Sequence, residues 1–121
     1  MAQIKFMKII IAGGRDFTDY ELMKSKCNHY LQNIDSPEIV SGMAKGADTL
    51  AIWYAKEFKL PLHGFPANWN LLGKKAGVIR NKEMLDFADL VICFWDGRSR
   101  STKNMIEITK EAGKKIRIVK Y

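Results

Sequence analysis

Short apolar runs alternate along this chain with longer stretches in which apolar residues recur every three or four positions. Strands that are buried on both faces of a parallel sheet show such short, unbroken apolar runs. The run at residues 90–95 is the most apolar of them. We therefore predict five strands, at residues 6–12, 38–41, 60–65, 90–95 and 115–120.

Helical stripes fill the gaps between the first three runs. The clearest covers residues 47–58, where apolar side chains lie three and four positions apart. An earlier stripe runs over residues 20–34. Thr18 and Glu21, near its start, fit a capping box. The Ser36-Pro37 pair is expected to break the chain before the second strand.

The later gaps predict two more helices. Residues 66–77 lack a clear period, and we expect a loop there that leads into a helix over residues 78–87. We expect the last helix to begin at a Ser101-Thr102 cap and to end at Gly113. Strands alternating with helices imply crossovers between parallel strands. The sequence thus predicts one α/β domain over residues 1–121, a three-layer Rossmann-like unit with a five-stranded, mainly parallel sheet and helices on both faces.

Composition excludes several other classes of protein. The chain has 121 residues, of which 47% are hydrophobic and 27% charged. No apolar run approaches the roughly 20 residues that span a bilayer. The first run leads into GGRDF without a small-residue cleavage site, so we expect no signal peptide, no membrane partner and a cytoplasmic location. Cys27 and Cys93 lack neighbouring ligands and are expected to be reduced core thiols; no metal site is predicted.

The net charge of +7 is concentrated near the end of the chain. From Gly97 onward there are eight basic and two acidic residues. Such a segment is compatible with an anionic ligand or nucleic acid, but also with a solvated helix whose last lysines favour the helix dipole. Charge alone leaves both interpretations open.

The carboxyl edge of the predicted sheet collects the unusual loops. These are GGRDF (residues 13–17), SGMAKGAD (41–48), FPANW (65–69) and FWDGRSRST (94–102). Ligands of open parallel sheets bind at this edge. The glycines and Arg15 of the first loop suit either a phosphate contact or a plain turn. The second loop matches no standard nucleotide fingerprint, yet a turn that enters a helix N-terminus presents free N–H groups.

Polar residues at two further helix starts extend this candidate site. Arg80 and Asn81 open the predicted third helix, while Arg98, Arg100 and nearby hydroxyls precede the last one. The candidate ligand-binding residues are Gly13, Gly14, Arg15, Asp16, Ser41, Gly42, Met43, Ala44, Gly46, Asp48, Arg80, Asn81, Asp96, Gly97, Ser99, Ser101 and Thr102.

Four motifs together resemble a known family. GGRDF, SGMAKGADTLA, FPANW with GKKAGVIRNKEM, and ADLVICFWDGRSRSTKNMI are similar, in this order, to the YspA-like branch of the SLOG superfamily. That superfamily is Rossmann-like and includes the DprA core and the LOG-type phosphoribohydrolases. The resemblance implies a domain that binds a nucleotide or a nucleotide-derived ligand, with no settled reaction. Two residues depart from its patterns: Met43 replaces a glycine of SGGAxGAD, and Ser101 replaces the glycine of WDGxSxGT.

The resemblance also bears on catalysis. LOG-type enzymes carry PGGxGTxxE, whose glutamate assists cleavage of an N-glycosidic bond, and Met105 falls at that position here. Glu107 lies two residues on, about 200° around an ideal helix, so it is expected to point away. Arg80 would then be an anion contact without its catalytic partner. These residues argue against LOG chemistry.

Three functions follow from these observations. The first is binding of a nucleotide-like small molecule such as AMP, ADP-ribose or NAD, with no required cofactor and, by analogy, a possible homodimer. In this hypothesis Arg15, Ser99 and Thr102 contact phosphate, Asp48 or Asp96 contacts ribose, and Arg80 clamps the anion. The second is DprA-like binding of single-stranded nucleic acid, with Trp53, Trp69 and Trp95 as stacking platforms, although the positions of Trp53 and Trp95 favour core packing. The third is a phosphoribohydrolase-type nucleotide hydrolase with an unrecognised acid.

Overall fold

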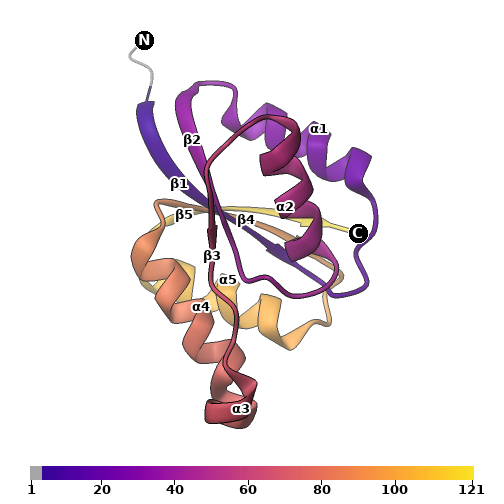
Figure 1. The fold of residues 1–121 in the computed structure, drawn as a ribbon, viewed down its shortest axis with the longest axis vertical. Helices are drawn as coiled ribbons and strands as arrows, with labels where there is room; N and C mark the ends of the chain where they lie inside the picture. The colour runs from indigo at the N-terminus through magenta and orange to yellow at the C-terminus, as the bar shows by residue number, and fades with distance from the viewer. Residues whose placement is uncertain (1–3) are drawn as a thin grey trace.

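The computed structural model describes residues 4–121 and contains one five-stranded sheet. All neighbouring strands are parallel, in the order β3-β2-β1-β4-β5 (Figure 1). The strands are β1 (Ile4–Gly13), β2 (Ile34–Ser41), β3 (Leu62–Gly64), β4 (Leu90–Trp95) and β5 (Lys115–Lys120). The predicted α/β Rossmann-like fold is confirmed.

Helices cover both faces of this sheet. α1 (Tyr20–Leu31) and α2 (Ala47–Glu57) lie on one face, whereas α4 (Ala76–Phe87) and α5 (Arg100–Glu111) lie on the other (Figure 1). The short α3 (Trp69–Leu72) and a 3-10 turn, η1 (Gly73–Lys75), project beyond the end of α4. Within residues 4–121, no helix is long and apolar enough to cross a membrane.

Two cores follow from the alternation of side chains along the strands. Ile9 and Ile11 of β1 pack with α1 and α2, while Ile10 and Ala12 pack with α4 and α5. Successive side chains of a strand point to opposite faces, so residues 9–12 of this central strand are all apolar. Each core contains one buried, free cysteine, Cys27 in the first and Cys93 in the second.

β2 begins earlier than predicted, because the Ser36-Pro37 pair does not break the chain. Pro37 lies inside the strand and pairs with Met7 of β1. Two residues later, the Ile39 N–H donates to the Pro61 carbonyl on the β3 side, 2.8 Å away. Pro37 faces that same side at a level where β3 does not pair, so its missing N–H removes no ladder bond.

Three local predictions also differ from the structure. Asp19, not Thr18, caps α1, with its side chain accepting from the Leu22 N–H at 3.0 Å. Residues 69–72 form a helix where a loop was predicted, and α4 begins at Ala76. Ser99, not Ser101, caps α5, whereas Gly113 follows that helix with the expected left-handed φ of 70°.

The sheet has a topological switch point between β1 and β4. β2 and β3 continue from one side of β1, while β4 and β5 lie on its other side. The connections after β1 and β4 therefore diverge at their carboxyl ends, which is where ligands of open α/β sheets bind.

Candidate functional site

A cavity of about 520 Å³ lies at the carboxyl ends of β1 and β4. Its walls come from the β1–α1 loop, the β2–α2 turn, the segment from α3 into α4, and the start of α5. The volume falls within the roughly 300–1,000 Å³ that is typical of small-molecule sites.

Most candidate residues meet at this cavity. Those that line it are Gly13, Gly14, Arg15, Asp16, Ala44, Asp48, Arg80, Asn81, Asp96, Ser99, Ser101 and Thr102. Those that do not are Ser41, Gly42, Met43, Gly46 and Gly97. Trp69, Lys74 and Arg100 also line the cavity. From the sequence, Arg100 was expected at the start of the last helix and Trp69 as a stacking platform, whereas Lys74 was not singled out.

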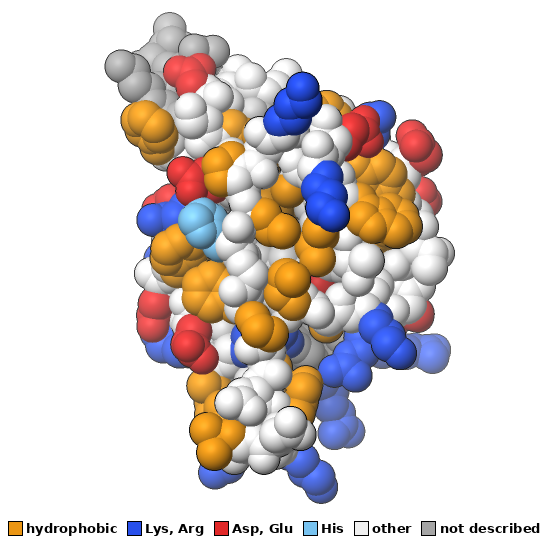
Figure 2. Space-filling view, in the orientation of Figure 1, with side chains coloured by type: hydrophobic (Ala, Val, Ile, Leu, Met, Phe, Trp, Pro, Cys, Tyr) orange, Lys and Arg blue, Asp and Glu red, His pale blue; other side chains and the backbone are white. Residues whose placement is uncertain are grey.

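Four cationic side chains and three carboxylates lie in the lining. Arg15, Lys74, Arg80 and Arg100 line the cavity, and among residues 4–121 none of them forms an ion pair. Figure 2 shows Lys and Arg side chains gathered at the lower right, the side at which the β1–α1 and β2–α2 connections of Figure 1 lie. The cations of the lining thus outnumber its carboxylates by one.

All three lining carboxylates accept hydrogen bonds within the protein. Asp16 accepts from the Tyr121 hydroxyl at 2.7 Å. Asp96 accepts from the Ser99 and Arg98 N–H groups at 2.9 and 2.7 Å, and these bonds hold its pKa below the ordinary value. Asp48 accepts from the Ala44 N–H through Oδ2 at 3.2 Å, which leaves Oδ1 as the oxygen that a ligand hydroxyl could approach.

The β2–α2 turn is not the open cradle that its sequence predicts. The Met43 N–H donates to Ser41 Oγ at 3.1 Å and the Ala44 N–H to Asp48 Oδ2 at 3.2 Å. At the start of α2, the Ala47 N–H donates to the Gly14 carbonyl at 3.1 Å. Because these donors are occupied within the protein, the turn is a scaffold that holds Asp48 at the cavity.

Met43 does not line the cavity, and its backbone has a left-handed conformation. Its φ is +64°, in the left-handed region where a glycine costs least. Its sulfur instead lies against Gly64, where a Cβ would approach it to 2.9 Å. The departure from the family's glycine therefore changes backbone strain and the surface beside β3, not the lining of the cavity.

Arg80 and Asp48 are buried side chains of opposite charge that both lie beside Gly42. They are 6% and 7% exposed, respectively. The Arg80 Nη1 donates to the Gly42 carbonyl at 2.6 Å, and its Nε donates to Asn81 Oδ1 at 3.2 Å. Burial raises the pKa of Asp48 and lowers that of Arg80, while each charge partly offsets the shift of the other. Arg80 thus serves the turn as well as the cavity.

The start of α5 faces the cavity, and Asn81 of α4 fixes its position. Asn81, 3% exposed, donates from Nδ2 to the Ser101 carbonyl at 3.1 Å and to Asn104 Oδ1 at 3.0 Å. Ser99 caps the helix through a long contact of 3.4 Å with the Thr102 N–H. The N–H groups of the first helical turn lack intrahelical partners, so this end of α5 carries a partial positive charge.

Trp69 supplies a flat apolar surface at the same cavity. It is 48% exposed, and the Arg15 guanidinium carbon lies 5.7 Å from its ring centroid. A Cβ on Gly77 would lie 3.4 Å from this ring, so the glycine leaves the indole close to α4. The sequence indicated Trp69 only as a stacking platform for nucleic acid, because a four-residue helix is too short to show a period that would orient its side chain. Asn68, which caps α3 through the Leu71 N–H at 3.1 Å, was the available signal.

The lining of α5 carries no acid where LOG-type enzymes have one. Met105 lines the cavity and is 1% exposed. Glu107 is exposed and lies outside the cavity, with its Oε1 3.9 Å from Lys103 Nζ. In the part of the chain that the structure describes, no group of three side chains could hold a metal ion.

Comparisons with known proteins add family and fold. The family model described as "YspA, cpYpsA-related SLOG family" matches residues 7–71. The Gene 61 protein of Mycobacterium phage D29 is 37% identical over 81 residues, which are 62% of this chain and 65% of the phage protein. DNA processing protein A from Helicobacter pylori, whose structure is described for its single-stranded DNA binding mode, matches with a TM-score of 0.65 at 18% identity, over 93% of this chain and 64% of that one. This chain thus spans slightly less than two thirds of either protein.

Proposed function

This chain belongs to the YspA, cpYpsA-related SLOG family, and from that premise we propose that its cavity binds a phosphate-bearing nucleotide ligand. One observation carries the proposal. The cavity brings four cationic side chains, the start of α5 and the exposed ring of Trp69 to the carboxyl ends of β1 and β4.

In the proposed complex, phosphate lies at the start of α5. Arg100, Ser101 and Thr102 offer a guanidinium, two hydroxyls and the N–H groups of the first turn. Arg15 and Lys74 face the same cavity from the β1–α1 loop and η1. Trp69 stacks on the base, and Asp48 accepts from a sugar hydroxyl.

The test is a binding screen with AMP, ADP-ribose, NAD and a cyclic nucleotide, read by thermal shift and isothermal titration calorimetry. We expect Arg100→Gln to weaken AMP binding by about 10- to 150-fold, the worth of a hydrogen bond to a charged group. The matched control is Lys110→Gln, on an exposed residue in the last turn of the same helix. If no compound binds, or if both variants bind AMP like the wild type, the proposal is wrong.

Single-stranded nucleic acid is a second candidate ligand. The observation that favours it is the combination of exposed Arg15, Lys74 and Arg100 with the half-exposed Trp69, because such ligands bind along cationic grooves with aromatic platforms. The Helicobacter pylori protein of similar fold binds single-stranded DNA. A fluorescence titration at several salt concentrations tests this function, since phosphate contacts make the affinity fall steeply as salt rises.

A further inference from the structure

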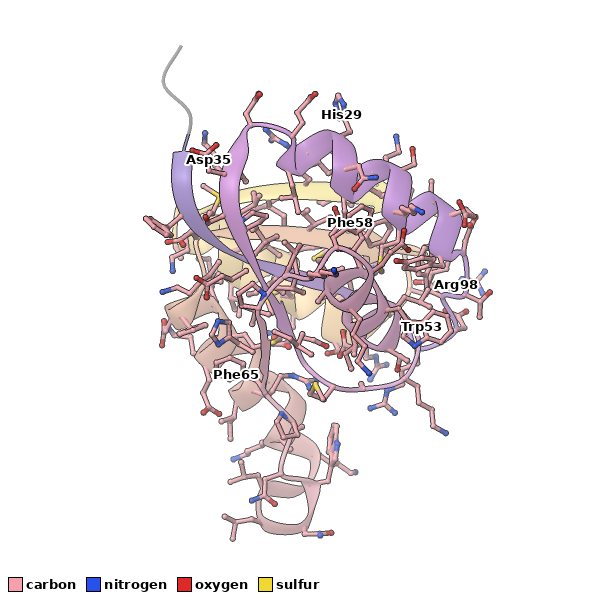
Figure 3. The ribbon with its side chains drawn as sticks, turned by 45° about the horizontal axis from the view of Figure 1, so that its top comes forward. His29, Asp35, Trp53, Phe58, Phe65 and Arg98 are labelled. Carbon is pink, nitrogen blue, oxygen red and sulfur yellow. The ribbon has the colours of Figure 1, made fainter. Side chains whose placement is uncertain are left out.

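We propose that a second base-binding site, built around Trp53, lies beside the cavity and that the protein's ligand is a single-stranded oligonucleotide rather than a free mononucleotide. The inference rests on the proposed function of the cavity and names the class of its ligand. The sequence favoured core packing for Trp53, but this side chain is 53% exposed on α2 (Figure 3).

The second site is a shallow groove of about 230 Å³. Its apolar lining comes from Phe17, Leu50 and Trp53. Thr18, Thr49, Gly46 and Lys45 complete its lining. An apolar floor with hydroxyls and one cation suits a planar base that is attached to a phosphate.

Neighbouring side chains hold the Trp53 ring in place. Tyr20 packs against it edge-on, with the ring centroids 5.9 Å apart and the planes at 68°. The Tyr20 hydroxyl donates to Glu57 at 2.7 Å, and Lys24 pairs with the same carboxylate at 2.6 Å. A ring positioned before binding loses little conformational freedom when a base stacks on it.

The groove and the cavity share one wall. Gly14, Arg15 and Asp16 line the cavity, and the next residues along the chain, Phe17 and Thr18, line the groove. The same alternation occurs across the β2–α2 turn, where Ala44 faces the cavity and Lys45 faces the groove. The Ala47 N–H and the Phe17 N–H both donate to the Gly14 carbonyl, at 3.1 and 3.2 Å, so the wall is rigidly joined.

Charge on this wall favours a polyanion over a neutral partner. Arg15 and Lys45 are exposed there, and within residues 4–121 neither forms an ion pair. A sugar-phosphate backbone that crosses the wall would meet both cations and would place one base at Trp69 and another at Trp53. A mononucleotide has no second base to occupy the groove.

The experiment compares a fluorescein-labelled deoxyadenylate octamer, by anisotropy, with dAMP, by calorimetry. Trp53→Ala should weaken octamer binding by about 5- to 150-fold, the worth of one stacked base, and leave dAMP binding unchanged. Trp53→Phe should retain most of the affinity because it keeps an aromatic face. Lys45→Gln should weaken only the octamer and reduce the salt dependence of its binding. Phe6→Ala is the matched control, on an aromatic residue that is 75% exposed near the opposite end of β1.

The outcomes separate this inference from the proposed function. If dAMP binds and Trp69→Ala weakens both ligands, but Trp53→Ala leaves the octamer unaffected, the second site is refuted and the cavity stands. An equal loss of dAMP and octamer affinity in Trp53→Ala also refutes it, since Trp53 would then act through the cavity. If Trp53→Ala weakens the binding of NAD but not that of the octamer, the proposal that the ligand is an oligonucleotide is refuted. If neither dAMP nor the octamer binds the wild type, the proposed function itself fails.

Discussion

Gly42→Ala should destabilise the protein strongly although position 42 is outside the cavity. A Cβ there would lie 2.6 Å from Arg80 Nη1 and 2.8 Å from Asp48 Oδ2, closer than either atom can tolerate. The φ of Gly42 is not positive, so alanine meets no backbone strain. The cost arises entirely from the buried charges that the methyl group displaces.

The magnitude follows from the contacts that must be given up. The Arg80 bond to the Gly42 carbonyl involves a charged donor, and such bonds contribute about 1.5–3 kcal/mol. Forcing a methyl group into a packed site costs about 1–3 kcal/mol more. Alanine recovers about 0.4–1 kcal/mol by restricting the unfolded chain. The free energy of unfolding should therefore fall by about 2–5 kcal/mol.

Urea denaturation at neutral pH measures this change, with Gly77→Ala as the control. Gly77 lies in α4, where a Cβ would make an ordinary 3.4 Å contact with Trp69, so alanine should stabilise by about 0.5–1 kcal/mol. In an Arg80→Ala background, Gly42→Ala should cost markedly less because the displaced guanidinium is gone. A Gly42→Ala variant as stable as the wild type, or a full cost in that background, would refute the reasoning.

Two further predictions concern the same turn. Burial raises the pKa of Asp48 above its ordinary value of 3.8, against the Ala44 N–H and the charges of Arg80 and Arg15, so the native state keeps this proton to higher pH than the unfolded chain does. The contribution of Asp48 to stability therefore falls as the pH rises from 3.8 through the raised value. In urea titrations, the free energy of unfolding of Asp48→Asn should increase relative to that of the wild type across this pH window. A difference that stays constant with pH would contradict the prediction. Met43→Gly should bind AMP like the wild type in calorimetry, because Met43 does not line the cavity. Its stability should change little, since about 1 kcal/mol of relieved left-handed strain is offset by the entropy of an added glycine.

Burial on two faces made most of the fold predictable. Residues 90–95 form a strand with the predicted bounds, because an apolar run between turn residues has few other stable solutions. Residues 115–120 also have the predicted bounds, although this edge strand is mostly exposed. β2 was predicted too short because the tolerance of Pro37 depends on where β3 stops pairing. That is a tertiary fact which no local pattern contains.

The candidate site was predictable by position but not by orientation. Topology requires the loops after β1, β2 and β4 to meet at one edge, and most of the candidate residues do line the cavity. Patterns do not show which way a side chain of a turn or a helix points. Trp53 was therefore expected in the core, and Lys74 and Trp69 were absent from the candidate set, because residues 66–77 have no period to orient them.

The occupied donors of the β2–α2 turn move the expected anion site to another loop. A glycine-rich turn before a helix suggests phosphate binding at α2, yet Ser41, Asp48 and the Gly14 carbonyl already accept from that turn's N–H groups. α5 begins with the long 3.4 Å cap contact and has Arg100 beside it. A phosphate would have to break three internal hydrogen bonds at the turn, whereas at α5 it would compete only with the long Ser99 cap contact. The glycines of SGMAKGAD thus make room for the Asp48 and Arg80 side chains and for close contact with the β1–α1 loop, and in the proposed complex the ligand's charge lies beside β4.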